Sequence, residues 1–179
     1  MNKYFPILGT EIPDIVGRDD ILQRLYNELT KPTPSHISIV GPRFSGKSVI
    51  LKALMKKLND LGSPFCGISY WDSGHQVPVS DEDFFRLMAH NLGKCLGKID
   101  SEYGEYLKDK GAGYGEIREV INALEQNQQR VLMLWDGFDK PLGSGKLTRN
   151  LWDNLLNLCR QPGLRVVTCT RKELHVTGH

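Results

Sequence analysis

The chain has 179 residues, 40% of them hydrophobic and 25% charged, which suits one domain with a packed core. Its formal net charge of +2 is too small to indicate nucleic acid or a membrane surface as a partner, although it does not exclude a local basic patch. No stretch resembles a signal peptide or a transmembrane helix, and the four scattered cysteines form no C-x-x-C pair. We therefore expect a cytoplasmic protein with reduced thiols and no membrane partner.

Helices and strands alternate along the sequence after an arm at residues 1–14 that is rich in turn signals. The apolar patterns predict helices at 19–29, 49–60, 81–96, 115–128 and 147–161, and strands at 36–40, 65–71, 131–135 and 164–170. Residues 97–115 contain five glycines and are expected to form a mobile insertion, with room for a short helix at 101–110. Residues 140–146 are expected to form a turn. Alternating strands and helices predict an α/β fold, with a mostly parallel sheet covered on both faces.

Residues 41–48 read G-x-x-x-x-G-K-[ST] and lie between a short β-branched strand and a helix. This motif folds backbone N–H groups around a phosphate tail, which also lies at the N-terminus of the following helix. Lys47 is expected to reach the outer phosphates, and the Ser48 hydroxyl to bind Mg²⁺. A glycine-rich turn without a ligand is the weaker alternative. The predicted phosphate-binding residues are Gly41, Pro42, Arg43, Phe44, Ser45, Gly46, Lys47, Ser48 and Val49.

Two further strands are followed by polar residues at their carboxyl ends. Ligands of parallel sheets bind at the carboxyl ends of the strands. Asp136 follows the apolar run 131–135 and is expected to bind Mg²⁺ opposite Ser48; the alternative is a turn aspartate in Asp-Gly. Asp139 is the candidate general base for an attacking water, or else a solvated loop acid. Arg171 follows the last strand, where it either contacts the γ-phosphate or faces solvent. Gly137 leaves no acid directly after Asp136, which predicts slow hydrolysis.

Other candidate sites are weaker. His175 and His179 are four residues apart near the end of the sequence, but without a third ligand they do not indicate a metal site. The three tryptophans at 71, 135 and 152 lie in apolar patterns and are expected in the core rather than on a nucleic-acid surface. The absence of an N-K-x-D motif disfavours a GTPase, and the absence of L-S-G-G-Q disfavours an ABC transporter subunit.

The chain resembles the STAND signalling ATPases, within the broader AAA-like group of P-loop ATPases that includes origin-recognition proteins. Residues 15–18 look like the h-h-G-R element of this family, and residues 41–48 are its Walker A loop. Residues 132–139 resemble its Walker B pattern, an apolar strand followed by D-x-x-[DE]. Residues 166–171 resemble its fourth strand, which ends in T-x-R with the arginine as sensor 1. Together these features cover nearly the whole chain.

The resemblance implies a three-layer P-loop fold in which the last strand lies between the first and third strands. It implies an ATP-driven switch that often self-associates and is held closed by ADP, with ATP or ADP and Mg²⁺ as cofactors. Val16, Gly17 and Arg18 would cover the adenine, and catalysis would use Asp139, Lys47 and Arg171. The expected division is residues 1–35, an arm with the adenine-covering helix, and residues 36–179, the ATPase core. The family continues with a fifth strand, a helical lid and further C-terminal domains, so we expect an N-terminal fragment.

Three functions compete. The first is the nucleotide switch of a STAND-type signalling or defence ATPase. The second is a DNA-linked AAA-like ATPase, such as a loader or transposition helper, which a basic strip on one face would favour. The third is a non-catalytic module that binds nucleotide for structure only, which Gly137 favours. A small-molecule kinase fits less well because of the h-h-G-R element.

Overall fold

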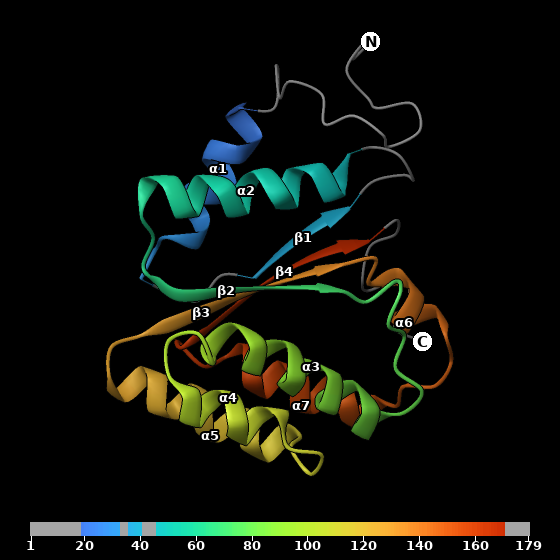
Figure 1. Cartoon of the computed structure of the whole chain (residues 1–179). Coiled ribbons are helices and arrows are strands. Elements are labelled where there is room, and N and C mark those ends of the chain that lie inside the picture. The colour runs from blue at the N-terminus through green and yellow to red at the C-terminus, as the bar shows by residue number, and fades with distance from the viewer. Residues whose placement is uncertain (1–18, 33–35, 41–45, 171–179) are drawn as a thin grey trace.

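The computed structural model describes residues 19–32, 36–40 and 46–170 (Figure 1). Its strands form one parallel sheet in the order β1-β4-β3-β2, so that β4 lies between β1 and β3, as expected. The described elements in chain order are α1 (Asp19–Leu29), β1 (Ile37–Val40), α2 (Lys47–Leu61), β2 (Phe65–Asp72), α3 (Asp81–Leu96), α4 (Ser101–Lys108), α5 (Tyr114–Gln126), β3 (Arg130–Asp136), α6 (Asp139–Gly143), α7 (Arg149–Cys159) and β4 (Leu164–Thr170).

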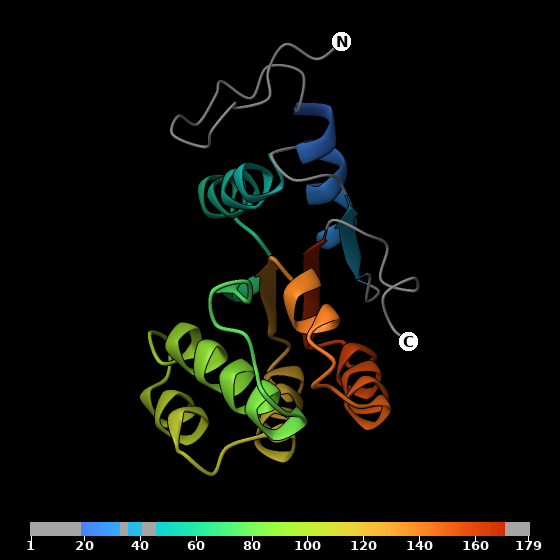
Figure 2. The ribbon, with the colours of Figure 1, turned by 90° about the vertical axis from the view of Figure 1, so that its right-hand side faces the viewer.

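Helices cover both faces of the sheet, which confirms the expected three-layer sandwich (Figures 1 and 2). α1 and α2 lie on one face, and α3, α5 and α7 lie on the other, with α4 packed on α3 from outside. β3 shows why its sequence is a continuous apolar run: Met133 and Trp135 face one core, while Leu132 and Leu134 face the other. No helix in the described ranges is long and apolar enough to cross a membrane.

The segment 97–115 packs into the core rather than forming an insertion, so that part of the prediction was wrong, but the short helix expected at 101–110 is confirmed. It contains α4, which packs closely against α3, and its Leu107 and Ala112 are buried in the core. The glycines serve this packing rather than a loop: a Cβ on Gly104 would lie 2.7 Å from the Cα of Gly97. Two helix backbones can approach this closely only where neither carries a side chain.

Adding a side chain at this helix crossing is expected to destabilise the fold. Gly104→Val would force the backbones of α3 and α4 apart and lower the free energy of unfolding by about 1–3 kcal/mol, measured by urea denaturation. Gly115→Ala is the matched control, because nothing lies within 4 Å of its Cβ position in α5. Alanine there is expected to be neutral or stabilising. Equal losses in both variants would contradict the close crossing.

Several local predictions can be compared directly with the structure. The Ser80 hydroxyl caps α3 by accepting a hydrogen bond from the Asp83 N–H at 3.1 Å, as predicted. The Asp83 carboxylate, however, accepts from the Val79 N–H at 2.9 Å rather than from the cap residue itself. Trp71 and Trp135 are buried and Trp152 is half-buried against the same core, which confirms their structural role. The turn expected at 140–146 instead begins within the short helix α6.

A buried arginine forms hydrogen bonds to residues 31 and 32, which follow α1. Arg165 lies inside β4 with no exposed surface, and its guanidinium donates to the carbonyls of Lys31, Pro32 and Pro162 at 3.1–3.3 Å. Arg130 donates to the Lys31 carbonyl as well, at 2.9 Å. Burial lowers the pKa of Arg165. These bonds satisfy carbonyls that follow the C-terminus of α1 and so hold α1 against the sheet.

Candidate nucleotide-binding site

The candidate site lies at the carboxyl edge of the parallel sheet. Val40 is in register with Thr170, and Trp135 with Thr168, so β1, β4 and β3 end at the same edge. α2 also begins at this edge, on the right-hand side of Figure 1. The topology therefore brings the start of α2 and the end of β3 together from opposite halves of the sequence.

The start of α2 suits an anion. Its N-cap is Gly46, which has a left-handed φ of 86° and has no side chain with which to cap the helix. The first turn of α2 contains no acidic residue, and Ser48 is exposed there. N–H groups at such a helix end bind phosphate well. Lys47 is the first residue of α2, whereas residues 41–45 lie outside the described part of the chain.

Asp136 ends β3 and is held in place through both its side chain and its backbone. The Tyr70 hydroxyl donates to Oδ2 of Asp136 at 2.6 Å, and the Gly137 N–H donates to Oδ1 at 3.0 Å. The N–H and hydroxyl of Ser73 both donate to the Asp136 carbonyl, at 3.0 and 2.7 Å. These bonds orient the carboxylate at the strand end.

Tyr70 and Asp72 belong to the site, although sequence reasoning missed them. Both lie on β2, where Asp72 is in register with Asp136 and accepts a hydrogen bond from Nδ1 of His75 at 2.6 Å. Burial, and then the hydrogen bond to Asp136, raise the pKa of the Tyr70 hydroxyl, so it stays a donor at neutral pH. An acid at a strand end was the signal used for Asp136, and the same signal would have found Asp72.

Removing the Tyr70 hydroxyl tests this bond. Tyr70→Phe is expected to lower the free energy of unfolding by about 1–2 kcal/mol, because a hydrogen bond to a carboxylate is removed from a half-buried position. Urea unfolding of Tyr70→Phe, Asp136→Ala and the double variant forms a double-mutant cycle. The two single losses should overlap, since either change removes the same bond. Fully additive losses would show that the bond does not form in solution.

The backbone at position 137 can accommodate only glycine. Its φ is +63°, and a Cβ at this position would lie 3.0 Å from the Cα of Gly74 and 3.1 Å from its nitrogen. Any side chain would be both strained and crowded by the loop after β2. The close approach of the two loops therefore excludes a second carboxylate directly after Asp136.

Phe138 anchors the loop after β3 to the rest of the fold. Its N–H donates to the Cys169 carbonyl in β4 at 3.0 Å. Its buried ring packs on Trp135, Phe84 and Trp152, with ring centroids 5.2–6.2 Å apart. Asp139 follows as the first residue of α6, and no observation assigns it the role of a base.

The other predicted residues lie outside the described ranges. Val16, Gly17, Arg18 and Arg171 belong to segments for which nothing is described, so their roles stay predictions. Within the described ranges, no group of three or more His, Cys, Asp or Glu side chains could hold a metal ion. Mg²⁺ usually keeps several waters and binds one or two carboxylates together with substrate phosphates, so the hard oxygens of Ser48 and Asp136 still suit it.

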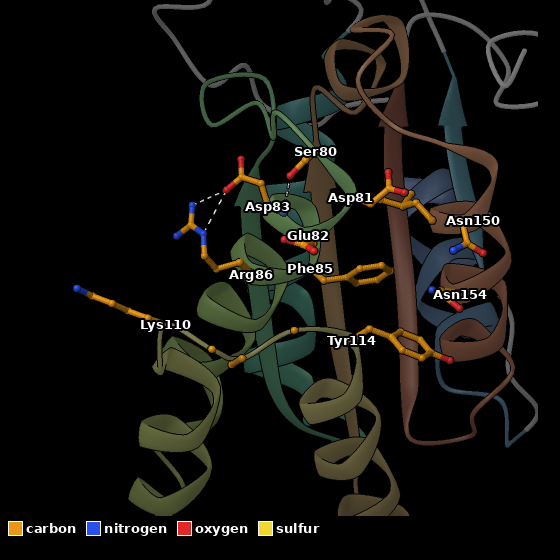
Figure 3. A pocket seen from close by; sticks show the side chains of 14 residues that line it. Ser80, Asp81, Glu82, Asp83, Phe85, Arg86, Lys110, Tyr114, Asn150 and Asn154 are labelled. Atoms are coloured by element: carbon orange, nitrogen blue, oxygen red, sulfur yellow. Dashed lines mark hydrogen bonds and ion pairs between the residues drawn. The ribbon is translucent and has the colours of Figure 1, made fainter.

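An open groove of about 750 Å³ lies on the opposite side of the sheet, between α3, the 110–114 segment and α7 (Figure 3). Two of its acids have partners: Asp81 accepts from the Thr148 N–H at 2.8 Å, and Asp83 pairs with Arg86 at 2.5 Å. Phe85 and Tyr114 pack together in it, with centroids 5.4 Å apart. This groove joins α3 to α7, and we assign it no ligand.

Comparison with known proteins agrees with this geometry. Residues 18–177 match the model of the NB-ARC domain family. No curated protein sequence matches the chain. Similar solved structures share its fold at low identity. Cdc6p of Pyrobaculum aerophilum is 14% identical with a TM-score of 0.53, and the match covers 92% of this chain and 41% of that one. Aeropyrum pernix ORC1 in complex with DNA is 17% identical with a TM-score of 0.59, and the match covers 96% of this chain and 44% of that one. A. pernix ORC2 in ADPNP–ADP complexes is 12% identical with a TM-score of 0.57, and the match covers 94% of this chain and 43% of that one. The chain thus spans less than half the length of each of these structures.

Proposed function

Since this chain belongs to the NB-ARC domain family, we propose that it is the ATP- and ADP-binding switch of a STAND-type signalling or defence ATPase. The chain is a nucleotide-binding P-loop ATPase domain by family and fold. One observation carries the finer proposal: β1, β4 and β3 are parallel and end at one edge of the sheet, where the start of α2 and the bonded Asp136 carboxylate both lie. A switch needs such an edge, because there the γ-phosphate can contact elements from both halves of the sequence.

Each part of the site receives a proposed role. Residues 41–47 hold the phosphates, and Ser48 with Asp136 holds Mg²⁺, which when bound neutralises charge on the phosphate oxygens. Asp139 orients the attacking water, and Arg171 contacts the γ-phosphate. The segment 15–18 covers the adenine. The arm with its adenine-covering helix comprises residues 1–35, and the ATPase core begins at residue 36. Because Gly137 excludes a second acid after Asp136, we expect turnover to be slow relative to nucleotide exchange.

A titration with ATP, ADP and GTP tests the proposal. We expect both adenine nucleotides to bind, with ATP affinity rising when Mg²⁺ is added, and GTP to bind much more weakly. Isothermal titration calorimetry with and without Mg²⁺ measures all three. Failure of either adenine nucleotide to bind would contradict the proposed switch, and equal affinity for GTP would contradict the adenine-covering role of residues 15–18.

A DNA-linked AAA-like ATPase is the second candidate. The solved structure of A. pernix ORC1 in complex with DNA has the same fold as this chain. ATP hydrolysis stimulated by added DNA would favour this candidate over a signalling switch. Hydrolysis that DNA leaves unchanged would favour the switch.

A further inference from the structure

The loop that follows β2 brings a histidine back onto the end of that strand. The N–H groups of His75 and Gln76 donate to the Asp72 carbonyl at 3.2 and 3.3 Å, so the chain turns back on itself directly after the strand. Nδ1 of His75 then donates to Oδ2 of Asp72 at 2.6 Å. The imidazole of this Asp72–His75 pair is 88% exposed, which leaves its other nitrogen, Nε2, open to a ligand.

The Asp72–His75 pair lies on the same face of the sheet as Asp136 and α2. Side chains alternate between the two faces of a strand. Tyr70 packs against the core under α1 and α2, so Asp72, two residues further along β2, is directed to that face as well. Leu134 and Asp136 have the same relation on β3, and Asp136 is the register partner of Asp72. Burial, then Asp136 and then Asp72, raise the pKa of the Tyr70 hydroxyl, as expected if both carboxylates lie near it.

The loop that carries His75 is held against the end of β3. Ser73 donates from its N–H and from its hydroxyl to the Asp136 carbonyl. A Cβ on Gly137 would lie 3.9 Å from Oδ1 of Asp72. The Asp72 carboxylate thus has one oxygen near the loop after β3 and the other bonded to the imidazole. His75 is therefore held beside the strand end that carries the candidate metal ligand.

An imidazole held in this way suits a phosphate oxygen. A protonated imidazole donates from both nitrogens, and Asp72 is the acceptor for one of them. An anionic oxygen at Nε2 would be the acceptor for the other, in a charge-assisted hydrogen bond. The carboxylates of Asp72 and Asp136 repel phosphate at this edge, and a positive charge on His75 offsets that repulsion.

We propose that His75 donates from Nε2 to the γ-phosphate of ATP and so makes the site prefer ATP to ADP. This inference rests on the proposed function, which places the phosphates at the start of α2. In the sheet, β2 lies one strand beyond β3 as seen from β1. Phosphates that enter at α2 reach the end of β2 last, so a donor there contacts the third phosphate and finds no partner in ADP. A switch needs such a difference in affinity between its two nucleotides.

Titration calorimetry with ADP and with a non-hydrolysable ATP analogue, both in the presence of Mg²⁺, tests the proposal. His75→Ala should weaken binding of the analogue about tenfold, the usual effect of one hydrogen bond to a charged group, and change the affinity for ADP less than about twofold. His75→Gln retains an N–H donor without the charge, so its loss should be smaller. An exposed pair contributes little to stability, so both variants should fold, which urea unfolding checks.

Gln76→Ala is the matched control, because it removes an exposed polar side chain from the next position of the same loop. It should leave both affinities unchanged. If the wild-type chain binds both nucleotides and His75→Ala keeps the wild-type ratio of their affinities, the contact is overturned and the switch stands. A wild-type chain that binds neither nucleotide would overturn the switch and this contact together.

Discussion

Replacing Lys47 with alanine is expected to weaken the binding of ATP and ADP by about 100-fold or more, which corresponds to roughly 2.7 kcal/mol of binding free energy. Lys47 is the first residue of α2, directly after the left-handed Gly46. A lysine at this point of the phosphate-binding motif contributes a full positive charge to the outer phosphates, where several negative oxygens converge. Titration calorimetry with both nucleotides measures the loss.

Lys52→Ala provides the matched control for this variant. It removes a lysine from the same helix, but from an exposed position more than one turn further along. Its nucleotide affinity should equal that of the wild-type chain, and urea unfolding should show all three proteins equally stable. If Lys47→Ala bound ATP as tightly as Lys52→Ala did, the motif at 41–48 would not be the phosphate site.

The parts of the fold that could be predicted are those set by local pattern. The continuous apolar runs of β3 and β4 predict strands buried on both faces, and the structure confirms this. Asp136 could be placed because it ends such a run. The strand order followed only from resemblance to a family, since periodicity says nothing about which strands become neighbours.

The parts that could not be predicted depend on which helices and strands become neighbours in the fold. Tyr70 and Asp136 are 66 residues apart, and only the pairing of β2 with β3 brings the hydroxyl to the carboxylate. The glycines at 97 and 104 suggested chain flexibility, whereas together with Gly93 they allow two helices to touch. Composition cannot separate these two uses of glycine, because both need only the absence of a side chain.

Replacing Asp136 with asparagine is expected to abolish the contribution of Mg²⁺ to ATP affinity and to lower the hydrolysis rate about 100-fold or more. Asparagine retains one oxygen, which can accept the hydrogen bond from Tyr70, but its NH2 group replaces the oxygen that accepts from the Gly137 N–H. The substitution therefore removes the negative charge and one hydrogen-bond acceptor while keeping the size of the side chain. Affinity for ADP measured without Mg²⁺ should therefore equal or exceed that of the wild-type chain, because a carboxylate near the phosphates has been neutralised.

Asp72→Asn tests whether this effect belongs to Asp136 in particular. The two carboxylates are register partners at the same edge of the sheet, so either change removes one negative charge from the same region. Asp72, however, pairs with the exposed His75 and is not bonded to Tyr70. Phosphate-release assays across a Mg²⁺ titration should show a severe loss of activity for Asp136→Asn and a mild one for Asp72→Asn. Equal losses would mean that the charge of the edge, rather than a metal ligand at the end of β3, determines Mg²⁺ binding.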